Sequence, residues 1–164
     1  MIPIFAPRSA KICEPSLPVL RPLSSVLRPP LATMLWFLRV LFLAVLGSML
    51  WVTSWASLHQ SIYAIPREVF THPWFIATLF DAYWGFLTFY LWQAWKEQSL
   101  AARGLWFIAV MLLGNIAMSV YVLAELFRIR DSSQLAGVIT HRNPGRLPLP
   151  AALVAAAVCI YLLA

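Results

Sequence analysis

The sequence predicts an all-α integral membrane protein, built as a helical bundle of four transmembrane helices with a central antiparallel hairpin. Of its 164 residues, 62% are hydrophobic and only 11% are charged. A soluble domain carries about a quarter charged residues to cover its core. The apolar residues also gather in runs of 18 to 24 residues, long enough to cross a bilayer as helices. This composition argues against a soluble enzyme, a disordered scaffold and a disulfide-stapled secreted module.

The charge balance and the cysteines argue against two common kinds of ligand. Twelve Lys and Arg stand against six Asp and Glu, giving a net charge of +6. The basic residues lie singly in the gaps between apolar runs, as membrane-flanking charges do, and form no patch for nucleic acid. Cys13 and Cys159 lack the spacing that holds zinc or an iron–sulfur cluster. We therefore expect no nucleic-acid partner, no metal and no cofactor.

Residues 1–33 are predicted to form a disordered, proline-rich tail, and residues 34–164 a single membrane domain. The tail holds seven of the twelve prolines, which prevents a continuous helix and supplies no core. Two alternatives stay open. The Arg and Ser content also suits a transit peptide, or translation starts at Met34 and the tail is an artefact of start-site choice.

The first predicted span covers residues 35–56, a 22-residue run whose only charge is Arg39. A helix of this length measures about 33 Å, enough to cross a hydrocarbon core of about 30 Å. Arg39 lies near its start, where the side chain can reach the head groups. A cleavable signal is the alternative, because Ser54 and Ala56 resemble a small-x-small cleavage site, although the run exceeds the usual apolar region of about 7 to 15 residues.

The second and third spans are predicted at residues 74–95 and 104–127. The second starts behind Pro73 and contains one charge, Asp81, and the third also contains one charge, Glu125. The polar link between the two spans has only eight residues. We therefore expect these helices to form the central antiparallel hairpin.

The last predicted element, residues 147–164, carries no charge. Its length is enough to span, but Pro148 and Pro150 restrict regular helix mostly to the 14 residues from Ala151, or about 21 Å. This element is either a fourth pass, or an interfacial or re-entrant segment that leaves three passes.

The orientation in the membrane depends on where the chain starts. With the tail included, the N-terminal side of the bundle carries seven Lys and Arg and the opposite side five, which favours a cytoplasmic N-terminus. A start at Met34 leaves three against five and reverses the preference. In both cases the expected location is the cell (inner) membrane.

Asp81 is the most informative residue, because a carboxylate near the middle of a span disfavours insertion by about 2.5 to 3.5 kcal/mol and should face other helices. Folding the hairpin about its link brings Asp81 opposite about position 118, and Trp84 opposite Asn115. We predict a polar site at mid-depth formed by Asp81, Trp84 and Asn115, with Ser48 as a weaker fourth member. Its role is either helix packing, at about 0.6 kcal/mol per hydrogen bond, or a proton or substrate site.

His72 and Glu125 are further weak candidates. Glu125 lies one turn from the end of its span, where it can reach water or Arg128. The loop before the second span is expected to bring His59, Glu68 and His72 to the same side as Glu125, where a metal or proton-sensing site is conceivable. Since no metal-ligand spacing supports such a site, we interpret the histidines as loop residues.

Two segments resemble an uncharacterised family of small multi-pass membrane proteins, a domain-of-unknown-function family. They are HPWFIATLFDAYWGFLTFYLWQAWKEQSLAAR and LLGNIAMSVYVLAEL. The resemblance covers roughly residues 35–130 and rests on His72, Pro73, Trp74, Asp81, Trp84, Lys96, Glu97, Gly114 and Asn115. It implies a membrane location and brings no activity with it.

The function favoured by the sequence is that of a non-enzymatic small membrane subunit or partner-binding protein. Its expected partners are the lipid bilayer and a second copy or another membrane protein. One alternative is an oligomeric proton-coupled carrier that uses Asp81. A further alternative is an intramembrane lipid or terpenoid enzyme with Asp81 as general acid. The chain contains no nucleophile elbow, phosphate loop or paired-carboxylate motif.

Overall fold

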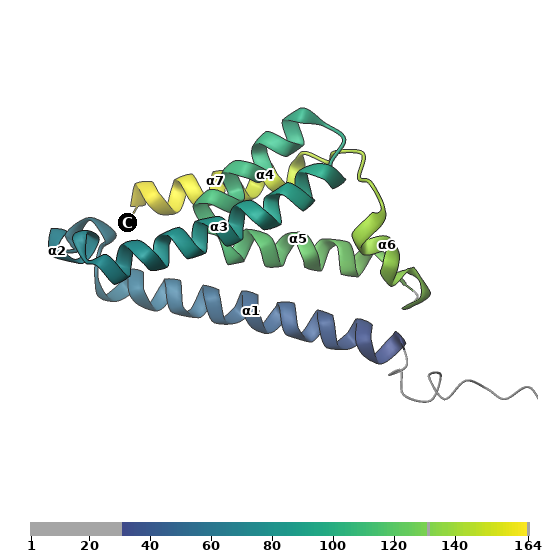
Figure 1. Ribbon diagram of the computed structural model, residues 1–164, viewed down its shortest axis with the longest axis horizontal. Coiled ribbons are helices and arrows are strands. Elements are labelled where there is room, and N and C mark those ends of the chain that lie inside the picture. Colours follow the sequence, from purple (N-terminus) through teal and green to yellow (C-terminus); the bar gives the residue numbers. More distant parts are fainter. Residues whose placement is uncertain (1–30, 131, 164) are drawn as a thin grey trace, which may run out of the picture.

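The computed structural model describes residues 31–130 and 132–163, and every regular element in these ranges is a helix (Figure 1). The all-α class is therefore confirmed. The tail predicted for residues 1–33 lies outside the described residues, except for its last three residues, which belong to the first helix.

Helix α1 runs from Leu31 to His59 and contains the first predicted span, 35–56. Among the described helices it is the one long and apolar enough to cross a membrane, over Thr33–His59. Only 6% of its most apolar stretch is buried inside the molecule. Its large apolar side chains therefore line the surface, among them Trp36, Phe37, Val40, Trp51 and Trp55.

A short connection leads from α1 into the second long helix. η2 (Ile62–Ala64) and α2 (Arg67–Thr71) follow α1, and α3 then runs from Pro73 to Lys96. α3 agrees closely with the span predicted at 74–95. Pro73 occupies its first turn, where a missing backbone N–H costs nothing because that group would have no partner in the helix.

The third predicted span, 104–127, is wrong as a single helix. It is divided into α4 (Leu100–Leu113) and α5 (Asn115–Arg128), and Gly114 between them has φ 51° and ψ −123°. Glycine adopts this positive φ without the steric cost that a Cβ would bring. The chain reverses at Gly114, so that α5 runs back beside α4 (Figure 1).

Helices α4 and α5 thus form a second hairpin, across which the rings of Trp106 and Tyr121 lie 5.0 Å apart. Each helix has 14 residues, or about 21 Å, less than the hydrocarbon thickness of about 30 Å. The ring of Phe86 from α3 fills the space beside the reversal. A Cβ added to Gly114 would lie 2.6 Å from Phe86 Cζ.

The chain continues through a polar segment into a last apolar helix. η3 (Ser132–Gln134) leads into α6 (Leu135–Thr140), and α7 runs from Pro148 to Leu163. α7 begins before the predicted start at Ala151, since prolines are tolerated in a first turn. It packs against α4, and near its end the Tyr161 hydroxyl donates to the Leu112 carbonyl at 3.1 Å.

Helix α5 is central to the packing. It contacts α1 on one side and α4 on another, while α4 also contacts α3 and α7 (Figure 1). Both clusters of buried apolar side chains include α5 residues. One consists of Trp106, Ala109, Val110, Ala117 and Tyr121, and the other of Leu35, Val122, Leu126 and Val138.

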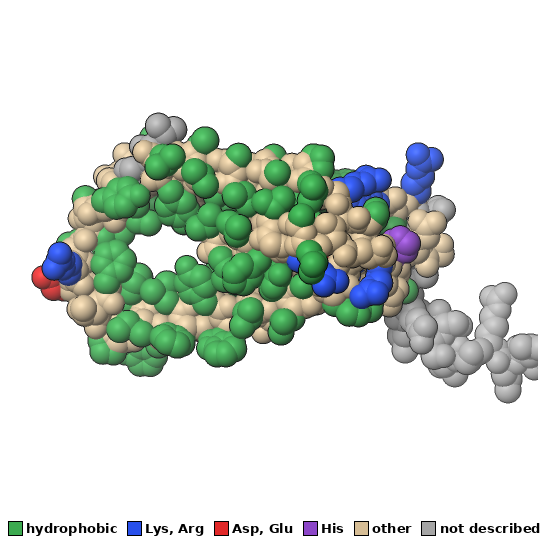
Figure 2. Space-filling model, turned by 90° about the horizontal axis from the view of Figure 1, so that it is seen from above, with side chains coloured by type: hydrophobic (Ala, Val, Ile, Leu, Met, Phe, Trp, Pro, Cys, Tyr) green, Lys and Arg blue, Asp and Glu red, His purple; other side chains and the backbone are tan. Residues whose placement is uncertain are grey.

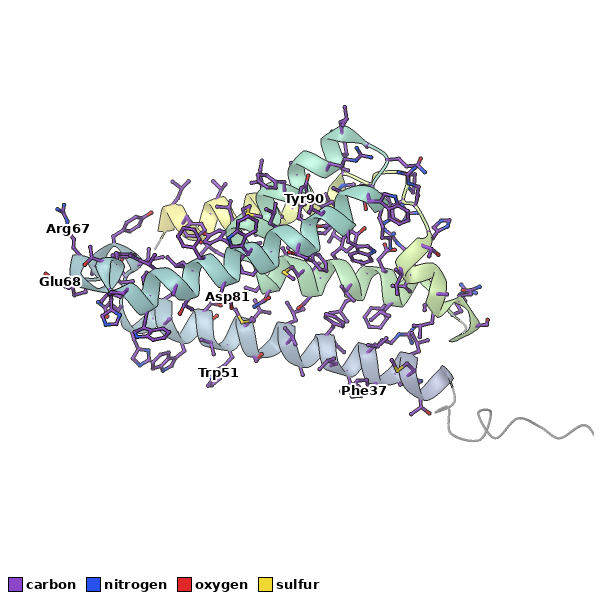
Figure 3. The ribbon with its side chains drawn as sticks, in the orientation of Figure 1. Phe37, Trp51, Arg67, Glu68, Asp81 and Tyr90 are labelled. Atoms are coloured by element: carbon purple, nitrogen blue, oxygen red, sulfur yellow. The ribbon has the colours of Figure 1, made fainter. Side chains whose placement is uncertain are left out.

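The two ends of the molecule differ in charge. α1 begins at the end where α3 and α5 finish, which we call the basic end; Lys and Arg side chains gather there in Figure 2. They are Arg39, Lys96, Arg103, Arg128, Arg130, Arg142 and Arg146. The opposite end, which we call the α2 end, carries Arg67 and Glu68 (Figure 3). The reversal at Gly114 causes this separation, because a continuous third span would have carried Arg128 to the α2 end.

Candidate functional site

Six polar side chains meet inside the basic end, and we call them the polar cluster. They come from the end of α3 and the link after it, from α5, and from the segment between α6 and α7. The members are Lys96, Glu97, Tyr121, Glu125, Arg128 and Asn143. Four of them are buried charged or amide residues, so the inside of this end is polar while the helix surfaces are apolar.

Lys96 is the last residue of α3 and is fully buried, with 0% exposure. Its ammonium donates to Glu125 Oε2 at 2.6 Å and to the carbonyl of Val138 in α6. The ammonium also lies 5.1 Å from the ring centre of Trp92 and 5.7 Å from that of Tyr121. These aromatic faces replace part of the hydration that the ammonium loses on burial.

Glu125 is 5% exposed and carries the ion pairs of the cluster. Besides Lys96, it accepts from Nη1 of Arg128, one helical turn later on α5. It also accepts from Asn143 Nδ2 at 3.1 Å. Two cations therefore compensate a single buried carboxylate, which is what allows a charge to remain buried in a folded protein.

Asn143 joins the two carboxylates of the cluster. Its Nδ2 donates to Glu97 Oε1 at 2.9 Å as well as to Glu125, and its Oδ1 accepts from Arg128 Nη1 at 2.9 Å. The backbone of Asn143 also donates to the Lys96 carbonyl at 2.8 Å and accepts from Gln98 N at 3.1 Å. The segment before α7 is thereby attached to the link between α3 and α4.

Glu97 differs from Glu125 in its surroundings. It is 3% exposed, and its Oε1 accepts from Asn143 and from the Tyr121 hydroxyl, the latter at 3.1 Å. Arg103 approaches it only through the backbone, since Nε donates to the Glu97 carbonyl at 2.8 Å. The Glu97 carboxylate forms no ion pair with any Lys, Arg or His among residues 31–130 and 132–163.

A cavity of about 330 Å³ opens beside the cluster. It is lined by Glu97, Trp106, Tyr121, Ala124, Glu125, Arg128, Asn143, Arg146, Pro148 and Leu149. Within the described part of the chain no group of three His, Cys, Asp or Glu is arranged to hold a metal ion. The cavity thus combines charged, aromatic and aliphatic walls, an arrangement suited to binding a small polar group.

The residues of the predicted site do not come together. Asp81 and Asn115 are exposed, Trp84 is 63% exposed, and no hydrogen bond between described residues joins the three. Asp81 lies in the first half of α3 (Figure 3) and forms no hydrogen bond or ion pair with a described residue. The hairpin register is correct as far as Phe86, which faces Gly114. Beyond Gly114 the chain reverses, and α5 runs back toward the end of α3, where Glu125 pairs with Lys96.

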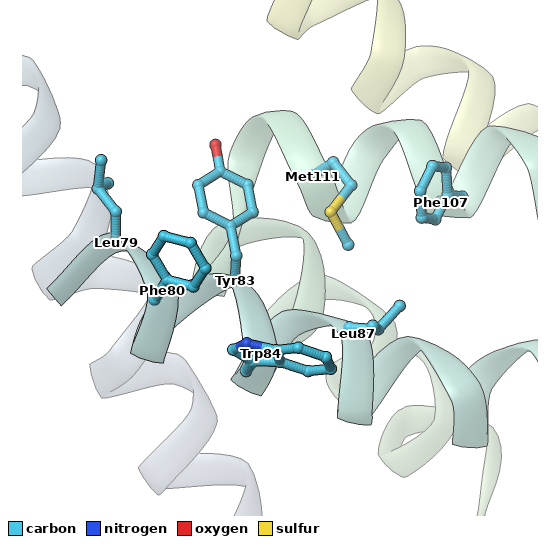
Figure 4. Close-up of a pocket in the computed structure, with 7 residues that line it drawn as sticks. All are labelled: Leu79, Phe80, Tyr83, Trp84, Leu87, Phe107 and Met111. Atoms are coloured by element: carbon cyan, nitrogen blue, oxygen red, sulfur yellow. The ribbon is translucent and has the colours of Figure 1, made fainter. Parts of the chain in front are cut away.

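Trp84 lies instead at an apolar cavity of about 520 Å³ between α3 and α4 (Figure 4). The cavity is lined by Leu79, Phe80, Tyr83, Trp84, Leu87, Phe107 and Met111. The indole therefore belongs to an apolar wall and not to a polar seam.

The three weaker candidate residues, Ser48, His72 and Glu125, lie in different parts of the structure. Ser48 is exposed and its hydroxyl donates to the Val45 carbonyl of its own helix at 2.9 Å. His72 is exposed and precedes α3 at the α2 end. The prediction that Glu125 reaches Arg128 is confirmed.

The expectation that His59, Glu68 and His72 share a side with Glu125 is wrong. Glu125 pairs with Lys96 at the end of α3, whereas His72 precedes the start of the same 24-residue helix. A helix of this length separates its ends by about 36 Å. The reversal at Gly114 is the cause, because it returns Glu125 to the end from which α4 started.

The sequence interpretation missed the partnership of Lys96, Glu97 and Asn143 with Glu125. One signal was present: an acid inside an apolar run needs a cation, and Lys96 ends the preceding apolar run. Their meeting requires the chain to fold back at Gly114, which hydropathy does not report.

Gln93 lies one turn before Lys96 on α3 and is fully buried, yet neither atom of its side-chain amide has a hydrogen-bond partner among the described residues. A buried amide without partners costs about 1–3 kcal/mol. Gln93→Met, which keeps the length of the side chain, is therefore expected to raise the stability of the detergent-solubilised protein by an amount of this order. Thermal unfolding measures it, with exposed Gln98→Met as the control. A Gln93→Met protein less stable than the control would contradict the prediction.

A family model described as "Protein of unknown function (DUF1475)" matches residues 31–143. The chain belongs to the DUF1475 family. The resemblance to an uncharacterised family is thereby confirmed, and the DUF1475 match extends from α1 to Asn143, so it includes every member of the polar cluster. No curated protein and no solved structure matches the chain.

Proposed function

We propose that this DUF1475 chain is a non-enzymatic, multi-pass integral membrane protein that acts as a small subunit or partner-binding protein. The observation that carries the proposal is an inverted polarity. Trp51 and Trp74 are 75% and 76% exposed, whereas Lys96 and Glu125 are buried. Water disfavours this arrangement and hydrocarbon favours it, because lipid solvates apolar side chains and charged ones must pair inside the protein.

The proposed membrane architecture follows the helices. α1, α3 and α7 are the crossings, and the α4–α5 hairpin enters from the basic end and returns to it. Seven of the eight Lys and Arg of the described residues lie at the basic end, with Arg67 at the other. By the positive-inside rule the basic end faces the cytoplasm. This orientation depends on residues of the described helices and their links and not on the start site.

The partner-binding part of the proposal is supported by the shape of the surface. Figure 2 shows an opening through the molecule toward the α2 end, ringed by hydrophobic side chains. Large apolar side chains also remain exposed on α1, α3 and α7. An apolar surface of this extent suits a component of a larger membrane assembly.

Fusion reporters and alkaline extraction test the membrane architecture. The full chain is expected to stay with membranes in alkaline carbonate and to dissolve in mild detergent. A reporter at the start of α1 should be cytoplasmic, and one after α7 should lie on the opposite side, since three crossings separate them. Four crossings would put both reporters on one side. Release by carbonate, or both termini on one side, would overturn the proposed architecture.

The mass of the purified particle tests the role as a subunit. The chain alone has a mass of 18.5 kDa, and light scattering in mild detergent is expected to give a defined larger protein mass. That mass would come from a second copy or from a membrane protein that co-purifies in fixed ratio. A chain that stays monomeric and captures nothing specific would contradict this role. The carrier and enzyme hypotheses gain no support, because Asp81 has no polar partner among the described residues.

A further inference from the structure

The cavity beside the polar cluster is lined by two charges of opposite sign that have no ion-pair partner in residues 31–130 and 132–163. Glu125 is compensated by Lys96 and Arg128. The Glu97 carboxylate accepts from two neutral donors, Tyr121 and Asn143, and pairs with no cation of the described helices and links. Arg146 lines the same cavity and makes no hydrogen bond or ion pair with another described residue. A buried carboxylate is stable when a cation reaches it, so the cavity has a place for one.

We propose that this cavity binds a zwitterionic group, an ammonium joined by a short linker to a phosphate, as in the headgroup of an aminophospholipid. This inference rests on the proposed function, because the group can belong to a lipid only if the chain lies in a membrane. The ammonium lies at the Glu97 carboxylate, beside the rings of Trp106 and Tyr121, whose faces attract cations. The phosphate lies at Arg146, which has no other partner in the part of the chain that the structure describes.

Arg128 supports the phosphate end of the site. Its Nη1 donates to Glu125 and Asn143, while its side chain is 39% exposed. The guanidinium has five N–H donors in a planar fork, so donors on Nη2 and Nε remain for a phosphate oxygen. Arg128 can therefore bind Glu125 and a phosphate at the same time. In this way it connects the ion pair inside the protein with the bound group.

The remaining walls fit the part of a lipid next to its headgroup. Pro148 and Leu149 begin α7, and with Ala124 they give the cavity an apolar side. The volume of about 330 Å³ lies within the range of small-ligand sites, about 300–1,000 Å³. The basic end is also where the proposed orientation puts anionic and zwitterionic headgroups. A simple anion fits less well, because it would leave the Glu97 carboxylate without a cation.

Lipid binding to the full chain in mild detergent tests the proposal. Native mass spectrometry with phosphatidylethanolamine and phosphatidylglycerol of identical acyl chains compares a headgroup that has the ammonium with one that lacks it. Phosphatidylethanolamine is expected to bind at least about tenfold tighter, since the contact with Glu97 is a charge-assisted hydrogen bond. Equal affinity of the two lipids would overturn the proposal.

Three variants assign the effect to the cavity. Glu97→Gln is expected to remove the preference for phosphatidylethanolamine, and Arg146→Gln to weaken binding of both lipids, because both carry the phosphate. Arg146 is exposed, so its replacement keeps the fold and the test holds even where Glu97→Gln does not fold. Glu68→Gln, at the α2 end, is the matched control and should change nothing. Unaltered lipid binding in Arg146→Gln would also overturn the proposal.

The zwitterionic group can come from a membrane lipid or from a soluble phosphoethanolamine compound. Soluble glycerophosphoethanolamine distinguishes these two sources. If it displaces phosphatidylethanolamine, the zwitterion alone is recognised. If it does not, the acyl chains contribute and the ligand is a membrane lipid; both results support the site. Carbonate extraction tests the proposed function independently, so a membrane protein without lipid preference would refute this inference alone.

Discussion

Glu125→Gln is expected to lower the free energy of unfolding by about 3–5 kcal/mol, because it leaves the Lys96 ammonium buried without a counter-ion. The ammonium is fully buried, and Glu125 is the one carboxylate among the described residues with which it forms an ion pair. The Val138 carbonyl and the rings of Trp92 and Tyr121 remain as neutral partners. They offset only part of the cost of keeping a charge away from water.

Unfolding of the detergent-solubilised protein measures the loss, and a second variant identifies its cause. Lys96→Met combined with Glu125→Leu removes both charges and should recover most of the lost stability, since well-packed apolar residues often replace a buried ion pair without cost. Arg128 then turns to solvent, which its 39% side-chain exposure allows. Exposed Glu68→Gln is the control and should change stability by less than about 0.5 kcal/mol. If Glu125→Gln behaves like this control, the ion pair is not a structural element of the fold.

Gly114→Ala is expected to destabilise the protein by about 2–6 kcal/mol. Its φ of 51° with ψ of −123° is strained for any residue with a Cβ, at a cost of about 1–3 kcal/mol. The new methyl group would also overlap the Phe86 ring, with 2.6 Å to Cζ, and such overpacking adds about 1–3 kcal/mol where the ring cannot move aside. Alanine at this position would therefore incur two separate costs, backbone strain and overlap with Phe86, which glycine avoids.

Thermal unfolding of Gly114→Ala alone and with Phe86→Leu separates the two penalties. The second change relieves the overlap, whereas the backbone strain remains, so partial recovery is expected. Gly85→Ala is the control, because Gly85 lies within α3 and a Cβ there has nothing within 4 Å. Alanine should stabilise that position by up to about 1 kcal/mol through its helix propensity. A Gly114→Ala protein as stable as Gly85→Ala would show that the chain does not reverse at Gly114.

Most helices could be predicted from the sequence because each depends on a continuous run of apolar residues. α1, α3 and α7 lie close to the predicted runs 35–56, 74–95 and 147–164. The register of the hairpin between α3 and α4 also followed from the length of its link, as the contact of Phe86 with Gly114 demonstrates. These features are local or depend on one short connection.

The candidate site could not be predicted in the same way. Placing Asn115 opposite Trp84 assumed a third helix that continues in one direction. The run 104–127 is apolar on both sides of Gly114, so hydropathy does not distinguish a reversal there from a continuous helix. Because α5 turns back, Asn115 lies on the surface and not opposite Trp84. For the same reason Glu125 lies beside Lys96 and not at the α2 end, where a continuous third helix would place it. One backbone conformation thus decides which charges meet.

The sequence alone determined that the chain is helical and where its long apolar helices lie, because hydropathy and helix signals act over neighbouring residues. It also showed that the few charges inside the apolar runs need a polar partner. Only the tertiary structure decided which of these charges are buried together. The direction of α5 depends on how the Phe86 ring and the Gly114 backbone fit each other across a distance in sequence. That fit is a matter of shape in three dimensions, on which the pairing of Lys96 with Glu125 and the cavity at Glu97 both depend.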